Sequence, residues 1–252
     1  MPGATPDSLI ALHDAGYREL AARLGPGLVL DVGCGTGFET VKLTGPGRVV
    51  VGVDYDPATA AGARSQWRQA GLLTACMDGG RLGLATASFD WVCSSHLVEH
   101  FVRPADHVGE LARVLKDDGS LLLVTPNRPA DFENPFHVAL MEREELAALL
   151  SGSFGEVWVG GLDGTPAVKA DFGNRRARAQ RILALDVFDL RHRIPHRWYV
   201  GLYTRVLPLA YRLMARRDSG GHSGITAEDF FVTDEVDHTT VALLAVARRP
   251  RR

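Results

Sequence analysis

The sequence has few of the features that mark secreted, membrane-spanning or nucleic-acid-binding proteins. Three cysteines in 252 residues are an odd and small number, which argues against a disulfide framework and fits a reducing compartment. Residues 1–10 lack the basic-then-apolar layout of a signal peptide, and no apolar run approaches the roughly 20 residues of a membrane span. The formal net charge of -2 gives no reason to expect a nucleic-acid partner. We therefore expect a cytoplasmic protein.

What is present is an ordinary globular composition, 46% hydrophobic and 23% charged, at a length that suits one α/β domain with an insertion. Cys34, Cys76 and Cys93 each lie in or at the end of an expected strand. Cysteine packs well as a small apolar side chain. We therefore expect all three to be buried fillers rather than reactive thiols.

A glycine-rich loop follows the first apolar run of the chain. Residues 29–37 read V-L-D-V-G-C-G-T-G, with Gly33, Gly35 and Gly37 at every second position. The run from 28 to 32 has the length of a buried parallel strand. Glycine at the end of such a strand allows a sharp turn and lets a ligand approach the main-chain N–H groups. A helix after the loop would point its N-terminus at that ligand.

Two acidic residues stand in a fixed relation to this loop. Asp54 ends the apolar run 49–53 and lies 17 positions after Gly37, where nucleotide-binding βαβ units carry an acid for the ribose hydroxyls. Asp31 lies two positions before Gly33. The dinucleotide fingerprint is G-x-G-x-x-G, and here the third glycine comes one residue early. An NAD-linked oxidoreductase is therefore disfavoured.

The pattern D-x-G-x-G-x-G resembles the first motif of the class I S-adenosylmethionine-dependent methyltransferases. Two further segments carry the same resemblance: S-S-H-x-x-E-H at 94–100 and R-V-L-K-D-D-G-S-L-L-L-V-T-P-N at 113–127. The resemblance covers residues 28–127 well and extends weakly to 159. It implies a doubly wound α/β sheet of seven strands whose last strand is antiparallel. It also implies S-adenosyl-L-methionine as the cofactor.

The resemblance also assigns cofactor contacts. An acid after the third strand faces the adenine amino group in this family, and residues at the end of the fourth strand lie near the methionine part. Together with the glycine loop and the end of the second strand, these positions give the expected cofactor-binding residues. They are Asp31, Gly33, Cys34, Gly35, Thr36, Gly37, Asp54, Tyr55, Met77, Asp78, Gly79, Ser94 and Ser95.

The segment His96 to His100 reads H-L-V-E-H, which is also the zinc signature of one metallopeptidase class. Two histidines four positions apart on a helix can share a metal ion. The segment begins where a parallel strand has just ended, however, and the sequence predicts no third ligand. We therefore expect no metal, and we expect Glu99 and His100 to be structural.

The acceptor side is expected at the carboxyl edge of the sheet, in the loop 131–138. Phe132 and Phe136 are apolar walls there, and His137 is the first candidate for a general base. His96 is the second candidate. Histidine suits this role because its usual pKa lies near the working pH. For each residue, a packing or hydrogen-bonding histidine is the alternative interpretation.

Apolar spacing, proline and glycine predict the order of the elements. Helices are expected over 7–24, 38–43, 57–70, 104–115 and 142–150. Strands are expected over 28–32, 49–53, 72–77, 90–94, 120–124, 154–159 and 239–247. The basic tail 248–252 is expected to be disordered.

A long connection separates the sixth expected strand from the last. Residues 175–217 contain eleven arginines and two acids, a formal charge of +9, and their apolar residues recur at helical spacing. We expect two basic amphipathic helices there. The cofactor domain would comprise 1–159 and 237–252, with 160–236 as a helical insertion that caps the acceptor. The positive charge of 175–217 has three alternative explanations: an anionic acceptor, a homodimer contact or a peripheral membrane surface.

These observations together predict methyl transfer from S-adenosylmethionine to oxygen, nitrogen or carbon of a small molecule. Three alternatives stay open. The acceptor can be a protein or a membrane lipid, the chain can be a non-catalytic S-adenosylmethionine-binding module, or it can be an NAD-linked oxidoreductase. Calorimetry with the two cofactors separates the last of these from the others.

Overall fold

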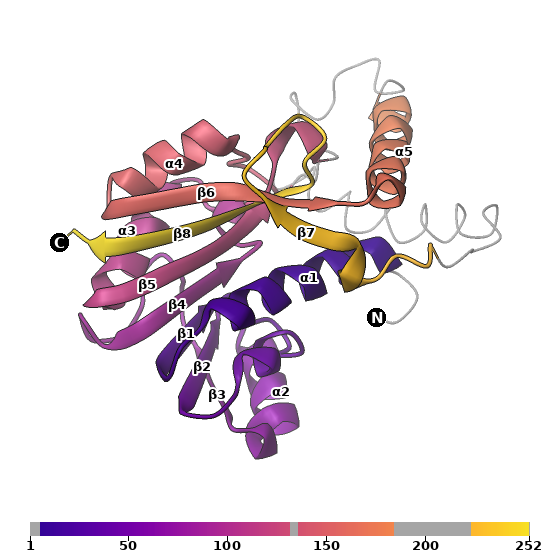
Figure 1. Cartoon of the computed structure of the whole chain (residues 1–252). Coiled ribbons are helices and arrows are strands. Elements are labelled where there is room, and N and C mark those ends of the chain that lie inside the picture. Colours follow the sequence, from indigo (N-terminus) through magenta and orange to yellow (C-terminus); the bar gives the residue numbers. More distant parts are fainter. Residues whose placement is uncertain (1–5, 132–135, 184–222, 252) are drawn as a thin grey trace.

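One mixed sheet forms the centre of the structure, a computed structural model that describes residues 6–131, 136–183 and 223–251. Within these ranges, eight strands follow the order β3-β2-β1-β4-β5-β8-β6-β7 (Figure 1). They are β1 (Gly27–Val32), β2 (Arg48–Asp54), β3 (Leu72–Cys76), β4 (Phe89–Ser95), β5 (Leu115–Pro126), β6 (Phe154–Gly164), β7 (Phe230–Thr233) and β8 (Ala242–Pro250). Strands β1 to β5 pair in parallel, whereas β8 runs antiparallel to both β5 and β6. The doubly wound sheet with an antiparallel last strand is thus confirmed, with one strand more than expected.

Four of the five α-helices in the described residues begin and end within three residues of their expected bounds, whereas α5 was not expected at its position. The α-helices are α1 (Asp7–Arg23), α2 (Pro57–Trp67), α3 (Pro104–Val114), α4 (Arg143–Ser151) and α5 (Pro166–Leu183). Short 3-10 helices are η1 (Thr40–Leu43), η2 (Arg68–Ala70), η3 (Val98–His100), η4 (Arg128–Ala130) and η5 (Ala227–Asp229). Asp56 caps α2 by accepting a 2.8 Å hydrogen bond from the Thr59 N–H, and Pro57 occupies the first helical position, which favours proline.

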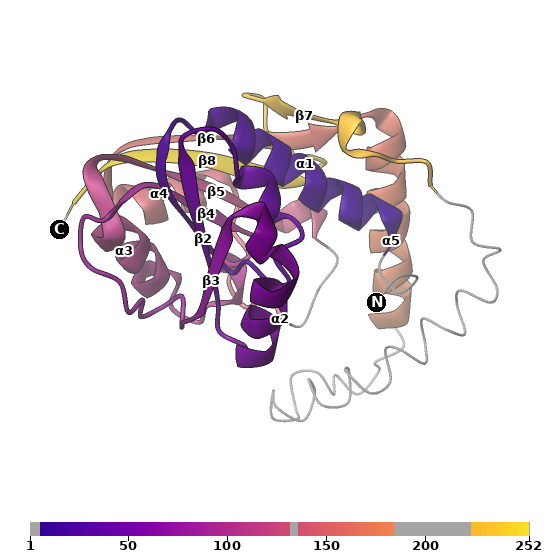
Figure 2. The same ribbon diagram turned by 90° about the horizontal axis from the view of Figure 1, so that it is seen from below.

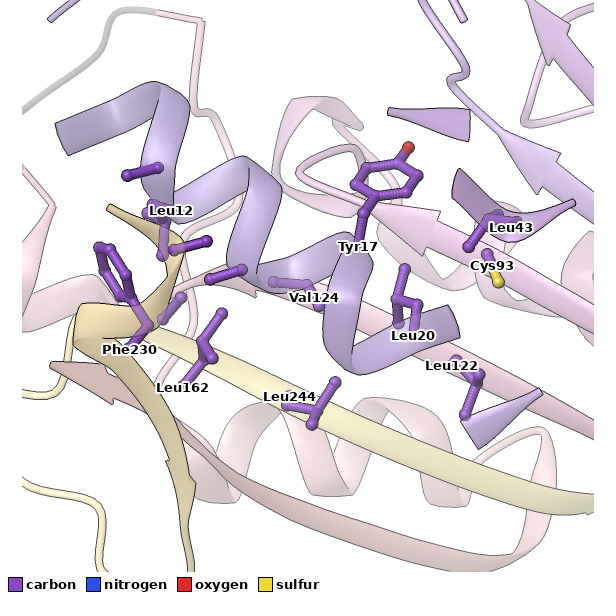
Figure 3. Packing of buried hydrophobic residues seen from close by; sticks show 14 of the residues in the cluster. Leu12, Tyr17, Leu20, Leu43, Cys93, Leu122, Val124, Leu162, Phe230 and Leu244 are labelled. Atoms are coloured by element: carbon purple, nitrogen blue, oxygen red, sulfur yellow. The ribbon is translucent and has the colours of Figure 1, made fainter. Parts of the chain in front are cut away.

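The sheet is buried on both faces. One apolar cluster joins α1 to the sheet (Figure 3), where Leu12 lies beside Phe230 and Leu20 lies on the side of Leu122. A second cluster joins α3 and α4 to the opposite face and includes Leu111 and Leu146. Burial on both faces explains why the strands read as continuous apolar runs rather than as alternating ones.

Helix α5 lies beyond the sheet, beside the amino-terminal end of α1 (Figure 2). The Ser8 hydroxyl donates a 2.6 Å hydrogen bond to Asp171 Oδ2, and Arg175 pairs with the same oxygen at 2.7 Å. None of the helices in the described ranges is both long enough and apolar enough to cross a bilayer.

Two expectations about local structure are wrong, and one strand was missed. Residues 38–43 do not form an α-helix, because only the 3-10 helix η1 follows the glycine loop; the stretch before Gly45-Pro46 is short and contains two β-branched residues. The tail is not disordered at Arg248–Pro250, since these residues end β8 and pair with Ser120, Phe154 and Glu156. The short strand β7 was not expected at all.

The expected insertion is described only in part. Residues 160–164 continue β6, and β7 (230–233) pairs with them through Gly161–Gly164, so residues near both ends of the range 160–236 form strands of the sheet. Helix α5 covers the start of the arginine-rich segment. The remainder of 175–217 and Phe132 lie outside the described residues, and the two basic helices stay a prediction.

Candidate functional site

The carboxyl ends of the central parallel strands meet at one edge of the sheet. In the strand register, Val32 of β1 pairs with Val53 of β2 on one side and with Ser94 of β4 on the other. Asp54 pairs with Cys76 at the end of β3. The glycine loop, the acid after β2, the turn after β3 and the end of β4 are therefore neighbours, as ligand sites of open α/β sheets require.

The three loop glycines all have left-handed backbone conformations, with φ of 84° at Gly33, 51° at Gly35 and 76° at Gly37. They differ in what a side chain would meet. A Cβ at Gly33 would touch Leu97, and one at Gly37 would collide with Trp67 at 2.8 Å. A Cβ at Gly35 would meet nothing within 4 Å. Gly35 therefore faces open space, which is the geometry of a loop that admits a ligand to its backbone.

Asp54 holds this loop. Its Oδ2 accepts a 2.9 Å hydrogen bond from the Gly35 N–H, and its Oδ1 accepts a 3.0 Å bond from the Asp56 N–H. Each carboxylate oxygen can accept a second bond, so the half-buried Asp54 retains acceptor capacity for a ligand. Tyr55 follows directly with 80% of its surface exposed.

Asp31 lies behind the loop and is fully buried. Its Oδ2 accepts hydrogen bonds from the Tyr17 hydroxyl at 3.1 Å and the Thr40 hydroxyl at 2.6 Å. Burial raises the pKa of Asp31 to about 7, against the opposing effect of these two donors. Figure 3 shows the Tyr17 hydroxyl pointing away from the apolar side chains of α1. Asp31 therefore ties α1 and η1 to the underside of the loop.

The remaining loop residues differ in exposure. Cys34 is buried, and burial raises the pKa of its thiol to about 12, so it is an inert filler as expected. Cys76 is exposed, and the expectation that it is buried is wrong because it closes an edge strand. Thr36 is exposed, and its carbonyl accepts a 2.9 Å hydrogen bond from Trp67 Nε1.

The turn after β3 lies beside Asp54. The Met77 N–H donates a 2.9 Å hydrogen bond to the Asp54 carbonyl. Asp78 is exposed, and its Oδ1 accepts a 2.8 Å bond from the Gly80 N–H. This is the side-chain-to-backbone bond typical of an aspartate at the start of a turn. The turn is therefore compact, with Met77 half-buried and the Asp78 carboxylate at the surface.

His107 on α3 joins this turn to β4 and was not foreseen. Its Nδ1 donates a 2.8 Å hydrogen bond to the Gly79 carbonyl, so its Nε2 accepts from the Ser94 hydroxyl at 3.1 Å. Phe101 stacks on the ring with centroids 4.3 Å apart. Burial lowers the pKa of His107 to about 4, which keeps the ring neutral. Ser94 therefore supports the turn through His107.

Comparison with known proteins agrees with this arrangement. A protein-family model described as a methyltransferase domain matches residues 30–123. "Probable S-adenosylmethionine-dependent methyltransferase Rv3030" of Mycobacterium tuberculosis is 34% identical over 164 residues, which cover 62% of this chain and 59% of that relative. A ubiquinone biosynthesis O-methyltransferase of Nitrosococcus oceani is 34% identical over 125 residues, covering 46% and 53%. The chain thus spans a little over half the length of these relatives.

A solved S-adenosylmethionine-dependent methyltransferase of Thermotoga maritima has the same fold. It superposes with a TM-score of 0.61 at 15% identity, covering 96% of this chain and 91% of that chain. Residues 30–123 thus match a methyltransferase domain, and the chain shares the fold of such enzymes. Both comparisons agree with the family and the cofactor expected from the sequence.

The groups at this edge of the sheet suit S-adenosylmethionine in kind. The open space at Gly35 allows a ligand to approach the backbone closely. Asp54 is bonded to the Gly35 N–H, and each of its carboxylate oxygens can accept one more hydrogen bond. The exposed Tyr55 and the half-buried Met77 lie beside it at the ends of β2 and β3. A nucleoside has ribose hydroxyls that can donate hydrogen bonds to a carboxylate and an aromatic base that can pack against such side chains.

Beyond β4, the chain buries polar side-chain atoms that have no hydrogen-bond partner among the described residues. Among the described residues, Ser95 Oγ, His96 Nε2 and Glu99 Oε1 are buried and accept or donate no hydrogen bond. His96 also has a left-handed φ of 50°, which is uncommon for a residue other than glycine. Buried polar groups without partners and backbone strain both concentrate at functional sites. These atoms therefore mark a second candidate part of the site at this edge.

Histidines from distant parts of the chain gather here. His13 of α1 packs against His96 with ring centroids 4.2 Å apart, and His137 packs against His100 at 5.0 Å. Burial lowers the pKa of His96 well below its usual value, with smaller effects from His13, His137 and His100. The two base candidates, His96 and His137, therefore belong to one neighbourhood.

Proposed function

We propose that this chain transfers a methyl group from S-adenosylmethionine to a small-molecule acceptor. The observation that carries the proposal is the open, left-handed turn at Gly35, whose N–H is held by Asp54. When bound, the cofactor supplies an electrophilic methyl group on a sulfonium. The protein then needs mainly to hold the donor and acceptor in line.

The cofactor contacts divide into direct and supporting groups. The backbone around Gly35 lies against the cofactor, and Asp54 accepts the ribose hydroxyls with its remaining lone pairs. Gly33, Cys34, Thr36 and Gly37 shape the loop. Asp31 acts from behind, because its carboxylate is buried against Tyr17 and Thr40 and holds the loop rather than the ligand.

The adenine side is formed by the turn after β3. Tyr55 and Met77 flank the base, Asp78 accepts from its amino group, and the backbone at Gly79 lies beside the ring. The contact between His107 and the Gly79 carbonyl supports this assignment, because it fixes the turn against α3.

The methionine part and the acceptor share the end of β4. Ser95 Oγ and His96 Nε2 are buried polar atoms without partners among the described residues, so a polar ligand group would satisfy them. Ser94 acts through its bond to His107. His96 and His137 are the groups that can take a proton from an acceptor that is protonated when bound.

The acceptor is proposed to be a small molecule because relatives at this level of identity include proteins named for ubiquinone and demethylmenaquinone methylation. The arginine-rich segment 175–217 favours an acceptor with negative charge. In this proposal, residues 1–159 with 237–252 carry the cofactor, and 160–236 cap the acceptor. A dimer contact and a membrane surface are the competing roles for the basic segment.

The experiment follows the methyl group itself. The full chain is incubated with S-adenosylmethionine labelled in the methyl group and a panel of phenols, hydroquinones, amines and phosphorylated amines. Labelled product together with an equal amount of S-adenosylhomocysteine supports methyl transfer. Binding of S-adenosylmethionine without transfer to any class would favour a non-catalytic binding module. Binding of NAD in place of S-adenosylmethionine would overturn the proposal.

A further inference from the structure

The sequence predicted no third ligand for a metal ion beside the motif His96 to His100. In the folded chain, His137 lies where it can be that ligand. One nitrogen or oxygen atom from each of Glu99, His100 and His137 lies within 4.8 Å of the others. His137 comes from the segment after β5, which the sequence spacing does not connect with η3. Two imidazoles and one carboxylate are therefore brought to one point.

The backbone fixes this meeting of two segments. The Glu99 carbonyl accepts hydrogen bonds from the Val138 N–H at 2.9 Å and the Ala139 N–H at 3.0 Å. The His100 ring also reaches the Phe136 carbonyl. The residues on both sides of His137 are thus hydrogen-bonded to η3. These bonds hold the three side chains close together.

Each histidine has its ring oriented by an acceptor. His100 Nδ1 donates to the Phe136 carbonyl at 2.9 Å, and His137 Nδ1 donates to Asp131 Oδ2 at 3.1 Å. Histidines that ligate metal ions commonly donate their other N–H to a carbonyl or a carboxylate, which fixes the tautomer and aims the ligating nitrogen. With the proton on Nδ1, the ligating lone pair of each ring is on Nε2.

The carboxylate supplies an independent sign of a missing partner. Glu99 is fully buried, and its Oε2 accepts a 3.0 Å hydrogen bond from the Thr125 hydroxyl. Its Oε1 has no hydrogen-bond partner among the described residues, and His96 Nδ1 lies 3.8 Å away. A buried carboxylate oxygen is costly to leave unpaired, and a cation would compensate it.

We propose that Glu99, His100 and His137 form a binding site for one divalent transition-metal ion. Two imidazole nitrogens and one carboxylate oxygen suit Zn²⁺ or Fe²⁺, whereas Mg²⁺ and Ca²⁺ prefer oxygen ligands. Ligands about 2.0–2.2 Å from one ion lie roughly 3–3.5 Å apart. The three ligand atoms now lie within 4.8 Å of one another, so a bound ion would draw them closer together.

Three protein ligands leave coordination positions open, as in catalytic rather than structural sites. Resting on the proposed function, the ion would take an oxygen of the acceptor and favour its deprotonated form. This role makes His137 a ligand rather than a base and leaves His96 as the group that takes the proton.

The test measures metal binding directly on the full chain without a polyhistidine tag. After treatment with a chelator, the protein is titrated with Co²⁺, whose visible absorption reports its coordination, and with Zn²⁺ by calorimetry. We expect one Zn²⁺ per chain. His100→Ala and His137→Ala should weaken binding at least about 100-fold, and Asp131→Asn, which acts through His137, about 10–100-fold. His238→Ala, which removes an exposed histidine outside the group, should change it less than twofold.

Two results would overturn the metal site: no binding of Co²⁺ or Zn²⁺ up to about 1 mM, or unchanged affinity in His100→Ala. His100 is exposed, so this variant keeps the test valid even where Glu99→Gln fails to fold. S-adenosylmethionine affinity is measured on the same samples. Zn²⁺ binding without S-adenosylmethionine binding would contradict the proposed function and support the metal site. S-adenosylmethionine binding without Zn²⁺ binding would contradict the metal site alone.

Discussion

The Gly35 N–H donates a 2.9 Å hydrogen bond to Asp54 Oδ2. This bond joins the loop after β1 to the acid at the end of β2, so the residue that offers open space and the residue that offers a carboxylate are held as one unit. A change at either position therefore acts on the cofactor both directly and through the other residue.

Gly35→Val should abolish S-adenosylmethionine binding. The side chain would occupy the open space at this position, and a residue other than glycine at φ 51° costs about 1–2 kcal/mol of backbone strain. The measurement is calorimetric titration with S-adenosylmethionine, with circular dichroism to establish that the variant is folded.

Gly71→Val is the matched control. Gly71 has φ 83°, and a Cβ there would also meet nothing within 4 Å, but it ends η2 and is not part of the glycine loop. It should lose similar thermal stability and keep its S-adenosylmethionine affinity within about twofold. Equal affinities in the two variants would show that the glycine loop is not the cofactor site.

Asp54→Ala should weaken S-adenosylmethionine binding by roughly ten- to a hundredfold. The loss of charge-assisted hydrogen bonds to the ribose costs on the order of 1.5–3 kcal/mol. Because Asp54 also holds the Gly35 and Asp56 N–H groups, the variant should melt at a lower temperature. Calorimetry and thermal melting measure the two effects separately.

Asp56→Ala provides the comparison for Asp54. It removes a nearby carboxylate that caps α2 through Thr59 and so lowers the melting temperature without touching the proposed ribose contact. A change in affinity below about twofold in Asp54→Ala, or an equal loss in Asp56→Ala, would remove the ribose assignment.

The sequence predicted the sheet edge because local patterns determine it. The apolar runs before Gly33 and Asp54 are long enough to be buried strands, and parallel strands align their carboxyl ends. Left-handed glycines are required by the turn itself, so Gly33, Gly35 and Gly37 could be assigned from spacing alone. The antiparallel last strand came from the family resemblance rather than from any local signal.

The supporting contacts could not be predicted, because they join residues far apart in the chain. His107 bonds to Gly79 and Ser94, and the one local sign was its position on the core-facing stripe of α3, four residues before Leu111. A buried histidine needs hydrogen-bond partners, and the residue spacing of one helix does not identify them. The neighbourhood of Glu99 and His137 likewise depends on how the segment after β5 folds back.

Stability should fall in acid partly through His107. Its pKa is about 4 in the fold against the ordinary 6.5, because burial outweighs the hydrogen bond to Gly79 and the Asp78 carboxylate. Both states are neutral above pH 6.5. Between pH 6.5 and 4 the unfolded chain takes up a proton that the native ring refuses, so stability is lost as pH falls. At about 1.4 kcal/mol per pKa unit, the loss is on the order of 3 kcal/mol.

His107→Gln isolates this contribution. The glutamine has no proton to take up, so the free energy of unfolding, measured by denaturant titration at several pH values, should fall less steeply between pH 6.5 and 4 than in the wild type. His13 and Asp31 also titrate with shifted pKa values, but they are present in both proteins. Parallel curves would show that His107 is not the group responsible.

The double variant Arg191→Glu with Arg193→Glu should raise the KM for the acceptor and leave S-adenosylmethionine affinity within a few-fold. These arginines belong to the segment 175–217, whose formal charge is +9 and which would attract an anionic acceptor. The wild-type KM should rise with salt, and that of the variant should not. A change in liposome binding with unaltered acceptor kinetics would favour the membrane-surface role instead.

His96→Asn should lower kcat by roughly 10²–10⁴-fold, the usual size of a general-base contribution, and leave S-adenosylmethionine affinity nearly unchanged. Asparagine tolerates the left-handed backbone of this position better than most residues, so the fold should persist. His96→Gly removes the same ring and also relieves the strain at φ 50°. Equal kcat values in the two variants would assign the loss to the imidazole, whereas recovery of activity in the glycine variant would assign it to the backbone. Wild-type kcat in His96→Asn would exclude His96 as the base.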